Sequence, residues 1–282
     1  MRVKPVFEKE ATEETKKIYG DIKSALGATS LPVFFAHLGA FPEYLDYISE
    51  PLIANLKEQK FKTLMKKMAE GMIPFINGRL QKSQELGLWI ERYRHSPSFY
   101  QFQKGVDDIF ILNLKLAFIF VALRESVKGW AIAAKKISSQ ASGQAEKADF
   151  WKDDVVFNPG DKNDFEIKWD KSGLIVIEEQ NGLMKSQHGT LEKNMLPEYF
   201  QLCRIDCANH MKKNMFWAVR VGLEEMILTS LPLFPHLILS PINVLINLTS
   251  KYQEFPDLLY LLAEHFPTSG VQRMMFSGYM KI

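Results

Sequence analysis

The most apolar stretch of the chain is IFILNLKLAFIFVAL, residues 109–123. A helix that spans a bilayer needs roughly 20 predominantly apolar residues. This stretch is shorter, and it contains Asn113 and Lys115, two side chains that are costly inside hydrocarbon. We therefore predict a helix that is buried in the core of a globular protein rather than a membrane span.

Most of the remaining sequence has the periodicity of amphipathic helices. Thr12 is a candidate N-cap, apolar side chains then recur every three or four residues through position 26, and Gly27 stands where a C-terminal glycine belongs. A second helix is predicted to begin at Pro42, because proline favours the first helical turn. Further periodic segments cover residues 61–72, 79–93, 107–129, 195–211, 214–230, 241–252 and 256–265.

One segment departs from this pattern, between residues 150 and 190. Residues 165–169, FEIKW, alternate apolar and charged side chains, DKSG at 170–173 supplies turn residues, and LIVI at 174–177 is apolar and β-branched. We predict a small β-hairpin here, inside a polar linker. The expected fold is thus all-α, with helical halves at residues 1–149 and 191–282 and a linker at 150–190.

The two halves echo each other in places. FPEYLDYI at residues 41–48 is similar to FPDLLYLL at 255–262, although the two do not occupy the same place in each half. Apolar helices that open at NLKL, residues 113–116, and SPIN, residues 240–243, each lie late in their half. These echoes leave two interpretations open, a duplicated helical unit and two unrelated halves.

The composition and net charge of the chain limit which classes of binding partner we predict. The 282 residues are 46% hydrophobic, and 35 basic against 33 acidic residues give a net charge of +2. Because phosphate-dominated binding normally needs a clearer basic surplus, we do not predict a nucleic-acid partner. The motifs GxGxxG, GxxxxGK[ST], GxSxG and HExxH are absent. Residues 1–17 contain no apolar run of signal-peptide length, which favours a cytoplasmic protein.

The cysteines support the same compartment. Cys203 and Cys207 are four residues apart, a spacing that makes a poor disulfide and is not the CxxC of a redox dithiol. With His210 they could supply three zinc ligands along one helical face. Because no second cluster of ligands is evident and cysteine is among the most buried residue types, we predict buried thiols in a reducing compartment, without a metal or cofactor.

Asn113 is the most informative polar residue. In an apolar helix an unpaired amide would cost about 1–3 kcal/mol, so its side chain must find partners. In one interpretation it bonds a neighbouring loop backbone or caps the helix. In the other it lines an internal pocket and holds a ligand oxygen or a water. The residues alone leave both interpretations open.

Four stretches together resemble a known family. In order along the chain they are IYGDIKSALG at residues 18–27, FPEYLDYI at 41–48, LNLKLAFIFVALRES at 112–126 and YQEF at 252–255. This order resembles the group I 2-haloacid dehalogenases of the DehI type along nearly the whole chain. The IYGDIK element also occurs in carboxymuconolactone decarboxylase and AhpD-like proteins, whose peroxidase members need a CxxC pair that this chain lacks.

The resemblance implies an all-helical fold of two related halves, with a ligand pocket between them and usually a homodimer. Family members hydrolyse small 2-haloalkanoic acids of either hand. An aspartate in the second half activates the water that attacks the α-carbon, and an asparagine in the first half helps to hold that water. The implied partner is therefore a small-molecule carboxylate, with no nucleic acid and no membrane.

Carried onto this chain, the resemblance implies that Asn113 is the water-holding asparagine and that Tyr252 and Phe255 are pocket aromatics. Met215 occupies the position of the catalytic aspartate, and methionine cannot accept a proton. Its neighbour Asn214 could orient a water or substrate but is no base. The nearest other carboxylate, Asp206, would be displaced by about 13 Å along a helix. Two functions remain: a hydrolytic dehalogenase, or a non-catalytic homologue that binds a small carboxylate or serves as a scaffold.

Overall fold

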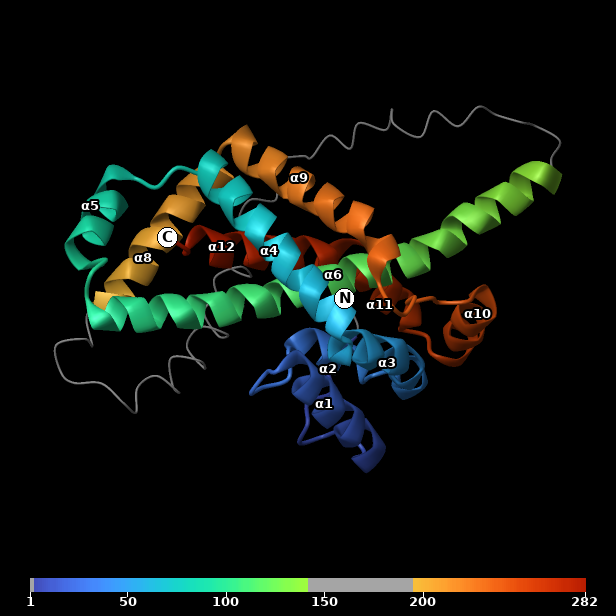
Figure 1. Ribbon diagram of the computed structural model, residues 1–282. Helices are drawn as coiled ribbons and strands as arrows, with labels where there is room; N and C mark the ends of the chain where they lie inside the picture. The colour runs from blue at the N-terminus through green and yellow to red at the C-terminus, as the bar shows by residue number, and fades with distance from the viewer. Residues whose placement is uncertain (1–2, 142–194) are drawn as a thin grey trace. The chain divides into compact units, whose positions relative to one another are not determined.

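The computed structural model describes residues 3–141 and 195–282 (Figure 1). Every regular element in these two ranges is a helix, and they contain no strand, so the predicted all-α class is confirmed. The predicted hairpin at 165–177, and with it the body of the 150–190 linker, lies outside the described residues. No helix in the described ranges combines the length and the apolar character that a bilayer crossing requires.

The described residues up to Ala134 and from Tyr199 onward form one compact unit. The earlier helices are α1 (Glu13–Leu26), α2 (Val33–Leu38), α3 (Pro42–Lys57), α4 (Gln59–Arg79), α5 (Gln84–Tyr93) and α6 (Pro97–Ala141). The later ones are α8 (Met195–Met211), α9 (Asn214–Ser230), α10 (Ile242–Lys251), α11 (Phe255–Tyr260) and α12 (Phe266–Tyr279). The 3-10 helix η2 (Leu231–Leu233) follows α9, and the π-helix η3 (Leu261–His265) runs directly from α11 into α12.

Several predicted helix ends are confirmed. The Thr12 hydroxyl accepts a hydrogen bond from the Thr15 amide at the start of α1, and Gly27 ends that helix in the left-handed conformation with φ 73°. Pro42 begins α3 as predicted. The predicted segment at 79–93 is shorter in the structure, because the Ser83 hydroxyl caps α5 and the helix starts only after it.

The last helix, α12, was not predicted from the sequence, yet it is central to the core. It packs against α4 and α9, which also contact each other (Figure 1). Gly270 lets α12 approach α6 closely, because a Cβ at this position would lie 2.9 Å from the Phe120 ring and 3.3 Å from the Cα of Ala117. A larger side chain at Gly270 would push α12 away from α6.

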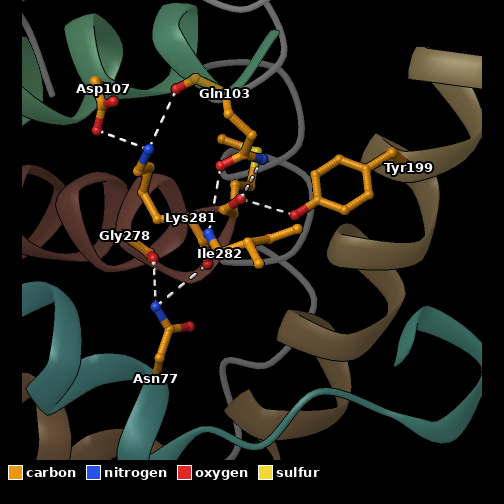
Figure 2. A network of polar contacts seen from close by, with 8 residues as sticks. Asn77, Gln103, Asp107, Tyr199, Gly278, Lys281 and Ile282 are labelled. Carbon is orange, nitrogen blue, oxygen red and sulfur yellow. Dashed lines mark hydrogen bonds and ion pairs between the residues drawn. The ribbon is translucent and has the colours of Figure 1, made fainter. Parts of the chain in front are cut away.

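Polar contacts hold the chain that leaves α12 (Figure 2). Helices α4, α6 and α8 each contribute. The contacts run from the Asn77 amide to the Gly278 carbonyl (3.1 Å), from the Tyr199 hydroxyl to the Met280 carbonyl (2.7 Å), and from the Lys281 ammonium to the Asp107 carboxylate (2.8 Å). The C-terminal end of α12 is thereby tied to three other helices.

The two echoing Phe-Pro segments meet in space. The Phe41 and Phe255 rings stand edge to face with centroids 5.3 Å apart, and the Tyr44 ring contacts Phe255 in the same way at 5.3 Å. The starts of α3 and α11 are therefore neighbours in the core. A duplicated helical unit stays a prediction. The ring contacts show only that the two similar segments lie next to each other.

Candidate functional site

The Asn113 side chain is bonded to α12. It is 7% exposed on α6, and its amide nitrogen donates to the Ser277 hydroxyl oxygen at 3.2 Å. The Ser277 hydroxyl in turn donates to the carbonyls of Arg273 and Met274, each at 3.0 Å. The Asn113 amide oxygen accepts no hydrogen bond from the described residues. Asn113 is thus positioned by a side chain of another helix rather than by a loop backbone.

Four residues of α12 form one face toward Asn113. Phe266, Gly270, Arg273 and Ser277 are spaced by four, three and four residues, which places them along one side of a helix. Contacts of this face with α6 occur along its length, because Ser277 bonds Asn113, Gly270 lies against Ala117 and Phe120, and Phe266 packs on Phe120 at 5.7 Å. We call Phe266, Gly270, Arg273 and Ser277 the α12 face.

Helix α2 adds an aromatic cluster at one end of the α12 face. The Phe34 ring lies 4.4 Å from the Phe120 ring and 5.0 Å from the Phe266 ring, between centroids, and all three are buried. His37, one turn along α2, has its ring 5.9 Å from Phe266. Burial is the main cause that lowers the pKa of His37, and the neighbouring His265 lowers it further. His37 is therefore held mainly neutral at pH 7.

Met215, the position that the resemblance assigns to the catalytic base, lies at the start of α9. Asn214 and Met215 begin α9, both are exposed, and the Met215 side chain is 51% accessible to solvent. No hydrogen bond joins Asn214 to Asn113 in the part of the chain that the structure describes. Asn214 and Met215 are thus exposed whereas Asn113 is buried, and their place beside Asn113 stays a prediction.

Tyr252 and Phe255 are brought together with each other, at the junction of α10 and α11. Their rings both pack on Phe41, with centroid separations of 5.4 Å for Tyr252 and 5.3 Å for Phe255. Phe255 is fully buried there, whereas Tyr252 keeps partial exposure. These two aromatics line the start of α3, and no ring contact joins them to the α12 face among the described residues.

The alternative carboxylate, Asp206, belongs to a different polar centre. It is 7% exposed on α8, and it accepts hydrogen bonds from the Tyr279 hydroxyl at 2.8 Å and from the Ser83 amide at 2.9 Å. Its bonding partners thus tie α8 to α12 and to the start of α5. In the described ranges no carboxylate is hydrogen-bonded to Asn113 or Ser277.

The two cysteines are free and buried on α8. Burial raises the pKa of the Cys203 thiol to about 12, and it also raises the pKa of Cys207. His210 does not join them, because its Nε2 is 2.8 Å from the Gln81 carbonyl. The described residues contain no group of three or more His, Cys, Asp and Glu side chains that could hold a metal ion.

Comparisons with protein-family models, with curated proteins and with solved structures found no match for this chain. The resemblance to the group I dehalogenases therefore stays a prediction from the sequence motifs.

Replacing Asn113 by alanine is expected to lower the free energy of unfolding by about 1–2 kcal/mol. The substitution removes one hydrogen bond to a buried hydroxyl and leaves a small void between α6 and α12. Urea denaturation measures the change. Ser277→Ala is the matched control, because it breaks the same bond and keeps the amide. A loss well below 0.5 kcal/mol for both variants would contradict a positioned Asn113.

Proposed function

We propose that the protein binds a small carboxylic acid beside Asn113 and does not hydrolyse it. One observation carries this proposal: the Asn113 amide is fixed by a hydroxyl, with its oxygen unused, and no carboxylate of the described residues is bonded to it. The ligand class comes from the order of the four sequence motifs, which are similar to those of the group I 2-haloacid dehalogenases.

The chemistry explains why binding is favoured over hydrolysis. Displacement of a halide by water needs a group that takes the proton of the attacking water, and this help is usually worth about 10²–10⁴ in rate. The Asn113 amide can orient a water through its oxygen but cannot take its proton. Met215 is no base, because methionine cannot accept a proton, and its side chain is 51% exposed at the start of α9.

The alternative is an active hydrolytic dehalogenase, which the four motifs in order also favour. Such an enzyme would need a free carboxylate near Asn113. Asp206 is a poor candidate, because its carboxylate already accepts two hydrogen bonds from Tyr279 and Ser83. For the protein as a whole we propose a cytoplasmic location, where its free thiols stay reduced, and a homodimer.

Neither enantiomer of 2-chloropropionate should yield chloride with the purified protein, whereas both should raise its melting temperature. Chloride release measured with a halide electrode, beside thermal melts with and without each acid, gives both results from one preparation. Met215→Asp is the matched variant and should change neither result, since its side chain is exposed. Sustained chloride release by the parent protein would refute the non-hydrolytic proposal.

A further inference from the structure

Arg273 lies on the α12 face, one helical turn before Ser277 and therefore near Asn113. Its guanidinium carbon lies 4.8 Å from the centroid of the Phe34 ring. The Phe34 ring itself packs on Phe120 and Phe266. The cation thus stacks on the aromatic cluster that closes one end of this face.

Arg273 has no counter-ion among the described residues. By contrast, the buried Arg124 pairs with Glu125 and Glu224, and Arg220 pairs with the same Glu224. Burial alone acts on the pKa of Arg273, which it lowers to about 10, whereas a nearby carboxylate would raise that pKa. The guanidinium remains charged at neutral pH and carries this charge without compensation.

An uncompensated, partly buried cation is costly in a folded protein, because water that would solvate it has been removed. Stacking on Phe34 compensates part of that cost through the face of the guanidinium. The N–H groups point outward from the edge of the same plane, and none of them donates to a described residue. Because these N–H groups are not used within the described residues, the planar guanidinium can donate two parallel hydrogen bonds to the two oxygens of a carboxylate.

The surroundings also favour an anion over a cation. The His37 ring lies beside the Phe266 ring, and its buried Nδ1 has no hydrogen-bond partner among the described residues. The remaining polar groups are the Asn113 amide and the Ser277 hydroxyl, which are neutral. The Ser277 hydroxyl donates within its own helix, whereas the Asn113 amide uses one of its two N–H groups for Ser277 and keeps the other. A small organic anion would therefore meet positive charge and one neutral donor, with apolar rings for its alkyl part.

We infer that the N–H edge of Arg273 is an anion-binding site that receives the carboxylate of a small organic acid, with the alkyl part of the acid against the aromatic cluster. The ligand class rests on the proposed function. The site itself rests on the unpaired guanidinium and its stacking on Phe34.

The test measures propionate binding by isothermal titration calorimetry, with inorganic phosphate and chloride as second and third probes. Arg273→Met should weaken propionate binding about 10- to 100-fold, the value of one or two lost charge-assisted hydrogen bonds. Arg273→Lys keeps the charge without the fork, and should fall between parent and Arg273→Met. Arg79→Met is the matched control, because Arg79 also stacks on a phenylalanine, Phe75, at 3.8 Å but is exposed.

A readout without ligand comes from thermal melts. Arg273→Met should melt at a higher temperature than the parent, because it removes an unpaired charge, and propionate should raise the melting temperature of the parent only. A destabilised Arg273→Met would show that Arg273 is structural and would overturn the assignment.

The remaining outcomes separate the site from the proposed function. Equal propionate affinity in parent and Arg273→Met overturns the Arg273 site and leaves the proposed function standing. Arg273-dependent binding of phosphate or chloride, without any binding of propionate, supports the site and overturns the proposed function. Absence of binding for all three probes overturns both.

Discussion

Replacement of Asp206 by alanine should lower the free energy of unfolding by about 3 kcal/mol. The Asp206 carboxylate is 7% exposed and accepts hydrogen bonds from the Tyr279 hydroxyl and the Ser83 amide. Truncation leaves the part-buried Ser83 amide without its acceptor and leaves the Tyr279 hydroxyl only the longer contact to the Gln81 carbonyl at 3.4 Å. Each lost hydrogen bond to a charged group costs about 1.5–3 kcal/mol. The loss also removes a negative charge that favours the buried ammonium of Lys82, whose pKa burial lowers.

Urea denaturation of the parent and variant measures this difference. Asp206→Asn is the matched control. Both hydrogen bonds end on one carboxylate oxygen, Oδ2, so an amide oxygen in its place can accept both. Only the charge is lost, which should cost about 1 kcal/mol. Tyr279→Phe removes only one donor and should behave similarly. If alanine at position 206 costs no more than asparagine, the two hydrogen bonds contribute nothing measurable and this account of the network is wrong.

The helices that could be predicted from the sequence have local signals at their ends. Thr12 and Gly27 bound α1 with a side-chain cap and a left-handed glycine, and both signals depend only on residues within the helix and its neighbours. The predicted segments 195–211 and 214–230 coincide with α8 and α9. In these cases local chemistry decides where the helix begins and ends.

Helix α12 could not be predicted from the sequence pattern, for a physical reason. Most of its residues are buried, on several sides of the helix, because α4 and α9 pack against it and α6 contacts it at Gly270 and Ser277. A helix that is buried on most sides has no polar face, so the apolar spacing that marks an amphipathic helix is missing. Its glycines, such as Gly270, also lower the helix propensity, although they are what permits close packing on α6.

The candidate site was partly predictable. Asn113 could be identified because an amide in an apolar helix must find a partner. That partner, Ser277, lies 164 residues further along the chain, and Arg273 lies on the same unpredicted helix. For Met215 the sequence shows which position of the motif it occupies. Its exposure on α9 depends on tertiary packing and could not be predicted from the sequence.

The Arg124→Met substitution is expected to lower the free energy of unfolding by about 3 kcal/mol. The Arg124 side chain is 9% exposed and bonds the Glu224 side chain, which is 16% exposed, as well as Glu125. Removing one partner of a buried pair leaves an uncompensated charge, and typically costs about 3–5 kcal/mol. Arg220, 3.4 Å from Glu224, still offers some compensation, which places the expected loss at the lower end.

The same change, arginine to methionine, is expected to act in opposite directions at the buried Arg124 and the partly buried Arg273. Arg124 has counter-ions and its loss destabilises, whereas Arg273 has none among the described residues and its loss stabilises. Urea denaturation of both variants at one pH and salt concentration tests the pair. The double variant Arg124→Met/Glu224→Leu should recover part of the lost stability, since it removes both charges. If both single variants shift stability in the same direction, the charge state of the neighbours does not decide the effect, and the anion site at Arg273 loses its energetic basis.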